Sequence, residues 1–185
     1  MKFKNRIMKN LCLVAFLAVF SLVGVQAQDT SFGVTTGFHN LTVRASANGA
    51  SASSGESGIF AGFFADIPVS DKLHVQPEVQ YATIFADGDT GNEVVIPIMA
   101  KYYAAEQFFV QAGPVIDIIV DDSEGLNAFG FGLGVGAGYE FSDKIFATTR
   151  YSFGLNNRLE DDIFEEISVD TKFNIFQIGV GYKFN

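Results

Sequence analysis

Two histidines are the residues in this sequence best suited to acid–base chemistry. His39 or His74 could act as the base of an acyl-transfer site, which also needs a nucleophile and an orienting group within hydrogen-bond reach. The two fall near opposite ends of separate predicted strands, so the sequence does not bring them into one site. We therefore expect no enzymatic activity and no cofactor, with a lipid-modifying membrane enzyme as the remote alternative.

Acidic and glycine-rich stretches suggest two further chemistries. Residues 121–124 and 160–166 could bind divalent cations through carboxylate oxygens, but they lack the spacing of a calcium-binding loop. We interpret them as a solvated surface or one that faces lipopolysaccharide, and we predict no metal site. The alternate glycines of 130–138 resemble a dinucleotide fingerprint, yet the alternation continues through them and no helix pattern follows.

Charged and amide side chains also occur at positions that we assign to the inward faces of strands. Glu78 and Arg150 lie at nearly the same depth when residues are counted from the short links that precede their strands, at 69–71 and 142–143. A buried charge without a partner is very costly, so we predict an interior network centred on this pair. We interpret this network as structural ion pairs that fill the interior enclosed by the strands, rather than as a proton or ion pathway. The predicted members are Glu78, Lys101, Asp117, Arg150, Gln76, Gln80, Gln111 and Gln177.

The elements that must position these side chains are β-strands, because hydrophobicity recurs with period two. In 129–141, large apolar residues alternate with glycines, and in 73–82 apolar residues alternate with polar ones. The last segment, 176–184, alternates in the same way. Less regular alternation predicts the other strands, at about 32–44, 58–68, 93–103, 107–120 and 144–156, which gives eight in all.

The connections between these strands alternate in length. Short links at 69–71, 104–106 and 142–143 contrast with longer polar ones at 45–57, 85–92, 121–126 and 157–170. Short turns at one end and long loops at the other are typical of outer-membrane barrels. We assign no structure to the low-complexity segment 45–57 and expect it to be mobile.

The N-terminus has the pattern of a Sec-type signal peptide. Cationic residues precede an apolar run, and small residues precede the expected cut after Ala27. The domains are then a signal peptide, 1–27, and a barrel, 28–185. Loss of four cations takes the net charge from −9 to −13 and makes nucleic acid an improbable partner. The only cysteine, Cys12, leaves with the signal.

These features together predict an all-β fold, an eight-stranded antiparallel up-and-down transmembrane barrel. In hydrocarbon every backbone donor and acceptor needs an internal partner, so a sheet spans a membrane only when it is closed. A barrel of this size is just wide enough for side chains, so inward glycines should face larger residues. We expect an aromatic belt near the short turns, formed by Tyr102, Tyr139, Phe141, Tyr182 and Phe184.

Several strand segments resemble an outer-membrane β-barrel family that includes the PorT-like proteins, which are abundant in Bacteroidetes. The similar segments are 33–34, 76–81, 96–103, 110–114, 136–141 and 150–155. The resemblance implies the outer membrane of a Gram-negative bacterium, and for the name-giving member a role in protein secretion. One departure is that Asn185 follows Phe184, where such barrels usually end on an aromatic residue.

The leading functional expectation is a structural or interaction role for a barrel with a packed lumen and acidic surface loops. The alternative is an accessory barrel for protein secretion or a narrow pore. Expected partners are outer-membrane lipid and lipopolysaccharide, the barrel-assembly machinery during insertion, and proteins of a secretion complex or the periplasm.

Overall fold

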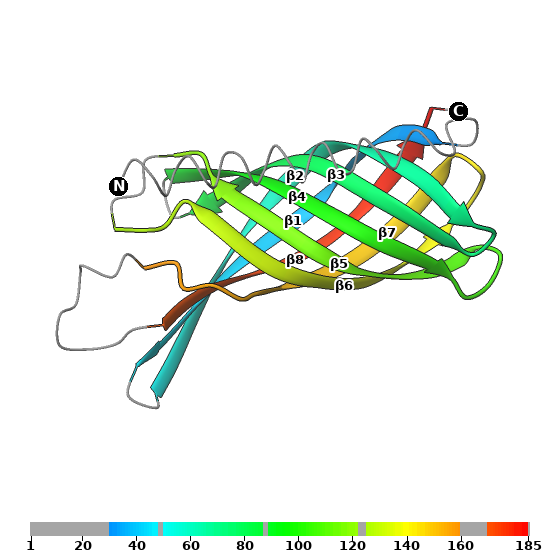
Figure 1. Ribbon diagram of the computed structural model, residues 1–185. Coiled ribbons are helices and arrows are strands. Elements are labelled where there is room, and N and C mark those ends of the chain that lie inside the picture. Colours follow the sequence, from blue (N-terminus) through cyan, green and yellow to red (C-terminus); the bar gives the residue numbers. More distant parts are fainter. Residues whose placement is uncertain (1–29, 48–49, 87–88, 122–124, 160–169, 185) are drawn as a thin grey trace, which may run out of the picture.

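A computed structural model describes residues 30–47, 50–86, 89–121, 125–159 and 170–184, which form a closed barrel of eight antiparallel strands (Figure 1). The strands are β1 (Ser31–Ala47), β2 (Ala50–Ser70), β3 (Leu73–Ala86), β4 (Asp89–Tyr103), β5 (Phe108–Ile119), β6 (Phe129–Glu140), β7 (Ile145–Gly154) and β8 (Asp170–Lys183). This confirms the predicted fold. The signal peptide and its cut lie outside the described residues.

Each strand pairs with its neighbours in sequence, and β1 pairs with β8 to close the barrel. The closing ladder runs from Gly33 opposite Lys183 to Ser46 opposite Asp170. Beyond it, the Phe184 amide donates to the Phe32 carbonyl at 2.8 Å, so the final aromatic residue is still tied to β1. Among the described residues, no helix is long and apolar enough to cross a bilayer.

Every strand contributes mainly apolar side chains to the outer wall, except at the projecting ends of β1 and β2. Side chains of alternate residues point outward, and they are mostly Phe, Tyr, Val, Ile and Leu. The five aromatic residues expected in a belt are all exposed near the short turns, by 42 to 62 %. The Tyr139 and Phe141 rings, for example, pack edge to face with centroids 5.3 Å apart.

Inward glycines make room for large rings. A Cβ atom at Gly138 would collide with the Phe109 ring, and one at Gly181 would collide with Phe146. The glycines therefore face larger residues, as expected for a barrel whose interior is filled by side chains.

Two of the four connections expected to be long are instead strands. β1 and β2 remain paired as far as Ala47 and Ala50, and β3 and β4 as far as Ala86 and Asp89. The predicted loops 45–57 and 85–92 are thus wrong for the described residues 45–47, 50–57, 85–86 and 89–92, whereas 48–49 and 87–88 lie outside the described residues. The small polar side chains of these segments resemble a loop in composition, but they fit an antiparallel ladder, which pairs the backbone groups that β1 and β2, or β3 and β4, turn toward each other.

The other two long connections are partly outside the described residues, at 122–124 and 160–169. Their described ends approach each other, because Leu126 forms a β-bridge with Leu159. The last strand begins earlier than expected, at Asp170.

We predict that Gly138→Ala destabilises the barrel by about 1–3 kcal/mol, because the added methyl group meets the buried Phe109 ring and the Ala147 carbonyl. Gly91→Ala is the matched control, since nothing lies within 4 Å of a Cβ atom there. Urea unfolding in lipid vesicles measures both. Equal stability of the two variants would contradict the packed interior.

Candidate functional site in the barrel lumen

The structure places all eight predicted side chains inside the barrel, each at most 6 % exposed. Six of them form a central polar group, defined here as Gln76, Glu78, Gln80, Gln111, Arg150 and Gln177. Lys101 lies nearer the short turns and Asp117 nearer the long connections, and each has its own partner.

Glu78 and Arg150 are at the middle of the central polar group. Arg150 donates through Nη2 to Glu78 Oε1 at 2.5 Å. Gln76 and Gln80 donate to the two oxygens of the same carboxylate, at 3.0 and 2.5 Å. All three β3 side chains share the inward face because they are two residues apart. The carboxylate is therefore surrounded by donors, which is what a buried charge requires.

Glutamine side-chain amides extend the central polar group to other strands of the barrel wall. Gln177 on β8 donates to Gln80 at 2.8 Å, and Gln111 on β5 donates to the Thr148 hydroxyl at 2.6 Å. Arg150 also reaches the Gln111 oxygen at 3.4 Å. Hydrogen bonds thus join four strands across the interior.

A second charge cluster closes the end near the short turns. Lys101 donates to Asp66 at 2.9 Å, and His74 Nδ1 lies 2.7 Å from the other oxygen of Asp66. Lys183 donates to Glu140 at 2.8 Å. Asp66, Glu140 and Lys183 were not among the site residues predicted from the sequence, although period two would have placed all three on inward faces.

Aromatic rings separate this cluster from the central group. Phe64, Phe109 and Phe146 pack together with Tyr103 beside them. The Lys101 ammonium lies 4.3 Å from the centroid of Phe109 and 5.2 Å from that of Phe146. A cation over ring faces is attracted by their quadrupoles, so Lys101 is held by rings as well as by Asp66.

Asp117 is paired with a residue that was assigned to a loop. Arg158, which follows β7, reaches into the lumen and binds the Asp117 carboxylate. Its guanidinium also lies 4.4 Å from the Phe173 ring centroid and donates to the Ala128 carbonyl at 3.3 Å. Gly130 leaves space for this pair, because a Cβ atom there would collide with both side chains. Sequence patterns gave no signal for Arg158, which lies outside the alternating segments.

The two histidines lie at different depths. His39 is fully buried, with its Nε2 atom 2.9 Å from Glu93 Oε1, whereas His74 belongs to the cluster near the short turns. Glu93 was not among the site residues predicted from the sequence. Its contact with His39 is an ion pair when the imidazole is protonated.

Apolar side chains fill the lumen on the long-connection side of the central group. Their shared feature is burial within one cluster, whose members are Leu41, Ile84, Val95, Met99, Val115, Phe173 and Ile175. The central polar group is therefore packed between an aromatic layer and an aliphatic one. This arrangement holds charges in fixed pairs.

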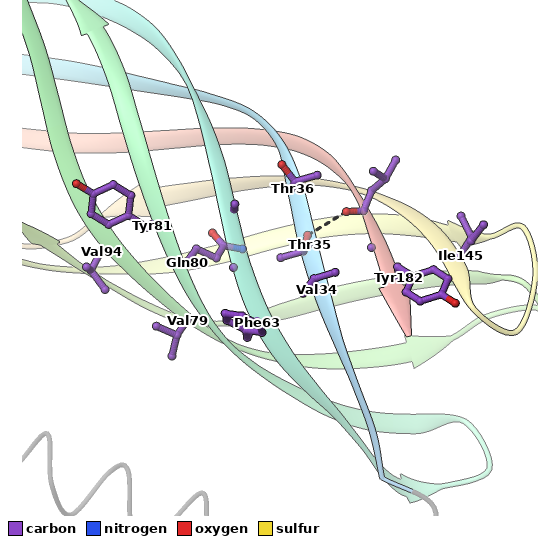
Figure 2. A pocket seen from close by; sticks show the side chains of 14 residues that line it. Val34, Thr35, Thr36, Phe63, Val79, Gln80, Tyr81, Val94, Ile145 and Tyr182 are labelled. Atoms are coloured by element: carbon purple, nitrogen blue, oxygen red, sulfur yellow. Dashed lines mark hydrogen bonds between the residues drawn. The ribbon is translucent and has the colours of Figure 1, made fainter. Parts of the chain in front are cut away.

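An apolar depression lies on the outer wall across β1, β2, β3 and β8, and Val94 of β4 and Ile145 of β7 also line it. Figure 2 shows Thr36 among outward-pointing Val34, Phe63 and Tyr182. The Thr36 hydroxyl donates to the Phe60 carbonyl at 2.8 Å, so its polar atom is satisfied within the wall. Such a surface suits lipid chains and offers little to orient a polar ligand.

Comparison with known proteins identifies the type of domain. A family model described as "Outer membrane protein beta-barrel domain" matches residues 26–160. No curated protein matches the sequence significantly.

Solved barrels of similar fold include three bacterial proteins. OprG from Pseudomonas aeruginosa is 14% identical, with a TM-score of 0.46 over 84% of this chain and 96% of that one. Neisserial surface protein A is 19% identical (TM-score 0.47; 85% and 100% covered). Ail from Yersinia pestis is 12% identical (TM-score 0.49; 85% and 100% covered). These similarities concern the fold alone.

We predict that Arg150→Met lowers the free energy of unfolding by about 3–5 kcal/mol, because it leaves the Glu78 carboxylate buried without its cation. The combined Glu78→Gln and Arg150→Met variant should lose less, since no unpaired charge remains. Urea unfolding in vesicles compares the wild type, both single variants and the double variant. Additive losses would show that the two side chains are not energetically coupled.

Proposed function

Because the chain belongs to the outer membrane protein β-barrel domain family, we propose that it has a structural or interaction role, holding its surface segments at the outer membrane. The family places it in the outer membrane of Gram-negative bacteria. The observation that carries the proposal is the filled lumen, in which charged side chains of several strands are paired and lie between apolar layers. A filled lumen fits a rigid anchor better than it fits a solute pathway.

The expected partners follow from the two surfaces of the barrel. The apolar outer wall would contact outer-membrane lipid and lipopolysaccharide, and the barrel-assembly machinery would insert the chain. Proteins of the periplasm or of a secretion complex would bind the ends of the barrel.

A role as a secretion accessory is the second candidate. It is favoured by the strand segments that resemble PorT-like proteins of Bacteroidetes, such as 76–81 and 96–103. Such a role also needs a partner surface rather than an open lumen, so it is compatible with the proposed packing. A stoichiometric secretion protein cross-linked to the barrel in intact cells would favour it over a freestanding barrel.

We predict that the purified protein produces no conductance above the bare-bilayer background when it is reconstituted into planar bilayers. The physical reason is that side chains occupy the lumen from the Lys101 cluster to Arg158. A known porin inserted under the same conditions is the positive control. Reproducible single-channel steps would overturn the proposal and favour the pore alternative.

We propose that the protein is not an enzyme. His39 and His74 are engaged with carboxylates at different depths of the barrel. Replacing both with glutamine should leave the lipid A profile of producing cells unchanged when it is measured by mass spectrometry. A loss of one lipid A modification, restored by the wild-type chain, would instead support a lipid-modifying activity.

A further inference from the structure

Three strands leave the barrel together on the side of the long connections. β1 remains paired with β8 as far as Ser46 and with β2 as far as Ala47, whereas the pairing of β2 with β3 ends at Ser57. Residues 50–56 therefore have β1 on one side and, within the described residues, no strand on the other. Figure 1 shows this hairpin, in blue and cyan, extending beyond the other strands.

The free edge of β2 is unusually open. Alternate residues of 50–56 direct their backbone N–H and C=O groups toward the open side, which makes a template for another strand. Natural edges are commonly blocked by lysine, proline or a bulge, but residues 50–56 contain no lysine and no proline. The β1–β2 ladder is also in continuous register there.

The side chains along this edge are small and solvent-exposed. They are Ala, Ser and Gly, with Glu56 as the only charge, and every residue of 50–56 is exposed. They provide neither a steric barrier to a second strand nor pockets for particular side chains. Recognition at this edge would therefore depend on backbone hydrogen bonds and on charge.

The charge at this end of the barrel indicates which kind of segment binds the free edge of β2. Glu56, Asp89 and Asp121 are exposed there. The cations of the projecting strands, Arg44 on β1 and Lys172 on β8, lie on the side of β2 away from its free edge, and Lys172 is paired with Asp170 at 3.0 Å. A second copy of the chain would bring the same negative charges together, whereas a cationic segment would be attracted.

We infer that residues 50–56 bind an extended, cationic segment of a partner protein by β-strand addition. This inference rests on the proposed interaction role and names the site and chemistry through which that role is carried out. The bound segment adds a fourth strand to the projecting sheet of β8, β1 and β2.

A synthetic peptide that alternates lysine with threonine is a direct probe of this edge. We expect it to bind the full-length barrel in nanodiscs and to protect the amides of 50–56 from hydrogen exchange. The same peptide with alternate backbone nitrogens methylated along its pairing edge should bind at least about tenfold more weakly, because it has lost those donors. A glutamate–threonine peptide should also bind at least about tenfold more weakly.

Two matched double variants test the edge from the side of the protein. Ser51→Pro with Ser53→Pro, and Ala52→Pro with Ser54→Pro, remove N–H groups that point to opposite edges of β2. Amide hydrogen exchange in β1 shows which of the two double variants keeps the β1–β2 hairpin paired. That double variant should lose peptide binding by at least about tenfold, since it removes only donors of the free edge.

Several outcomes would overturn the inference. These are no binding of the lysine–threonine peptide, equal binding of the methylated peptide, or unchanged binding by the variant that retains the hairpin. Protection of amides elsewhere on the barrel would reject this edge while leaving the interaction role intact. Self-association abolished by the same prolines would identify a second copy as the occupant. The conductance measurement tests the proposed function independently.

Discussion

The β1–β8 ladder is the constraint on which the rest of this structure depends. Hydrocarbon provides no partner for a backbone amide or carbonyl, so the sheet can span the membrane only because its first and last strands hydrogen-bond to each other. Closure then fixes the direction of every side chain, since alternate residues must face lipid or the lumen. The apolar outer wall and the paired charges inside are two results of that single geometric condition.

The inner face of β6 shows how a narrow lumen can hold long side chains. Its glycines present almost no side-chain volume, and the space is taken by residues from neighbouring elements. Phe109 lies against Gly138, and the Asp117–Arg158 pair lies against Gly130. The glycine-rich inner face of β6 thus leaves room for bulky side chains of other elements, which keeps the interior densely packed.

Sequence periodicity was sufficient to predict the eight strands and eight of the inward polar residues, because period two reports directly on which side a residue faces. It predicted that Glu78 and Arg150 lie at similar depth. It could not assign the partners of Lys101 and Asp117, because contacts across the lumen depend on how the ladder is staggered around the barrel. Arg158 comes from a segment without alternation. The paired strand ends 45–47 and 50–57 were hidden by their Ala, Ser and Gly composition, which local patterns do not distinguish from a loop.

Strand length differs greatly around the barrel. β1 and β2 contain 17 and 21 residues, whereas β6 and β7, on another side of the wall, contain 12 and 10. The rim formed by the described strands is consequently a slope instead of a level ring, and the sheet has a tall side and a low side in the plane of the membrane. A neighbouring protein that diffuses laterally meets a tall side or a low side according to its direction of approach. The orientation of the barrel about the membrane normal therefore determines which side a neighbouring protein contacts.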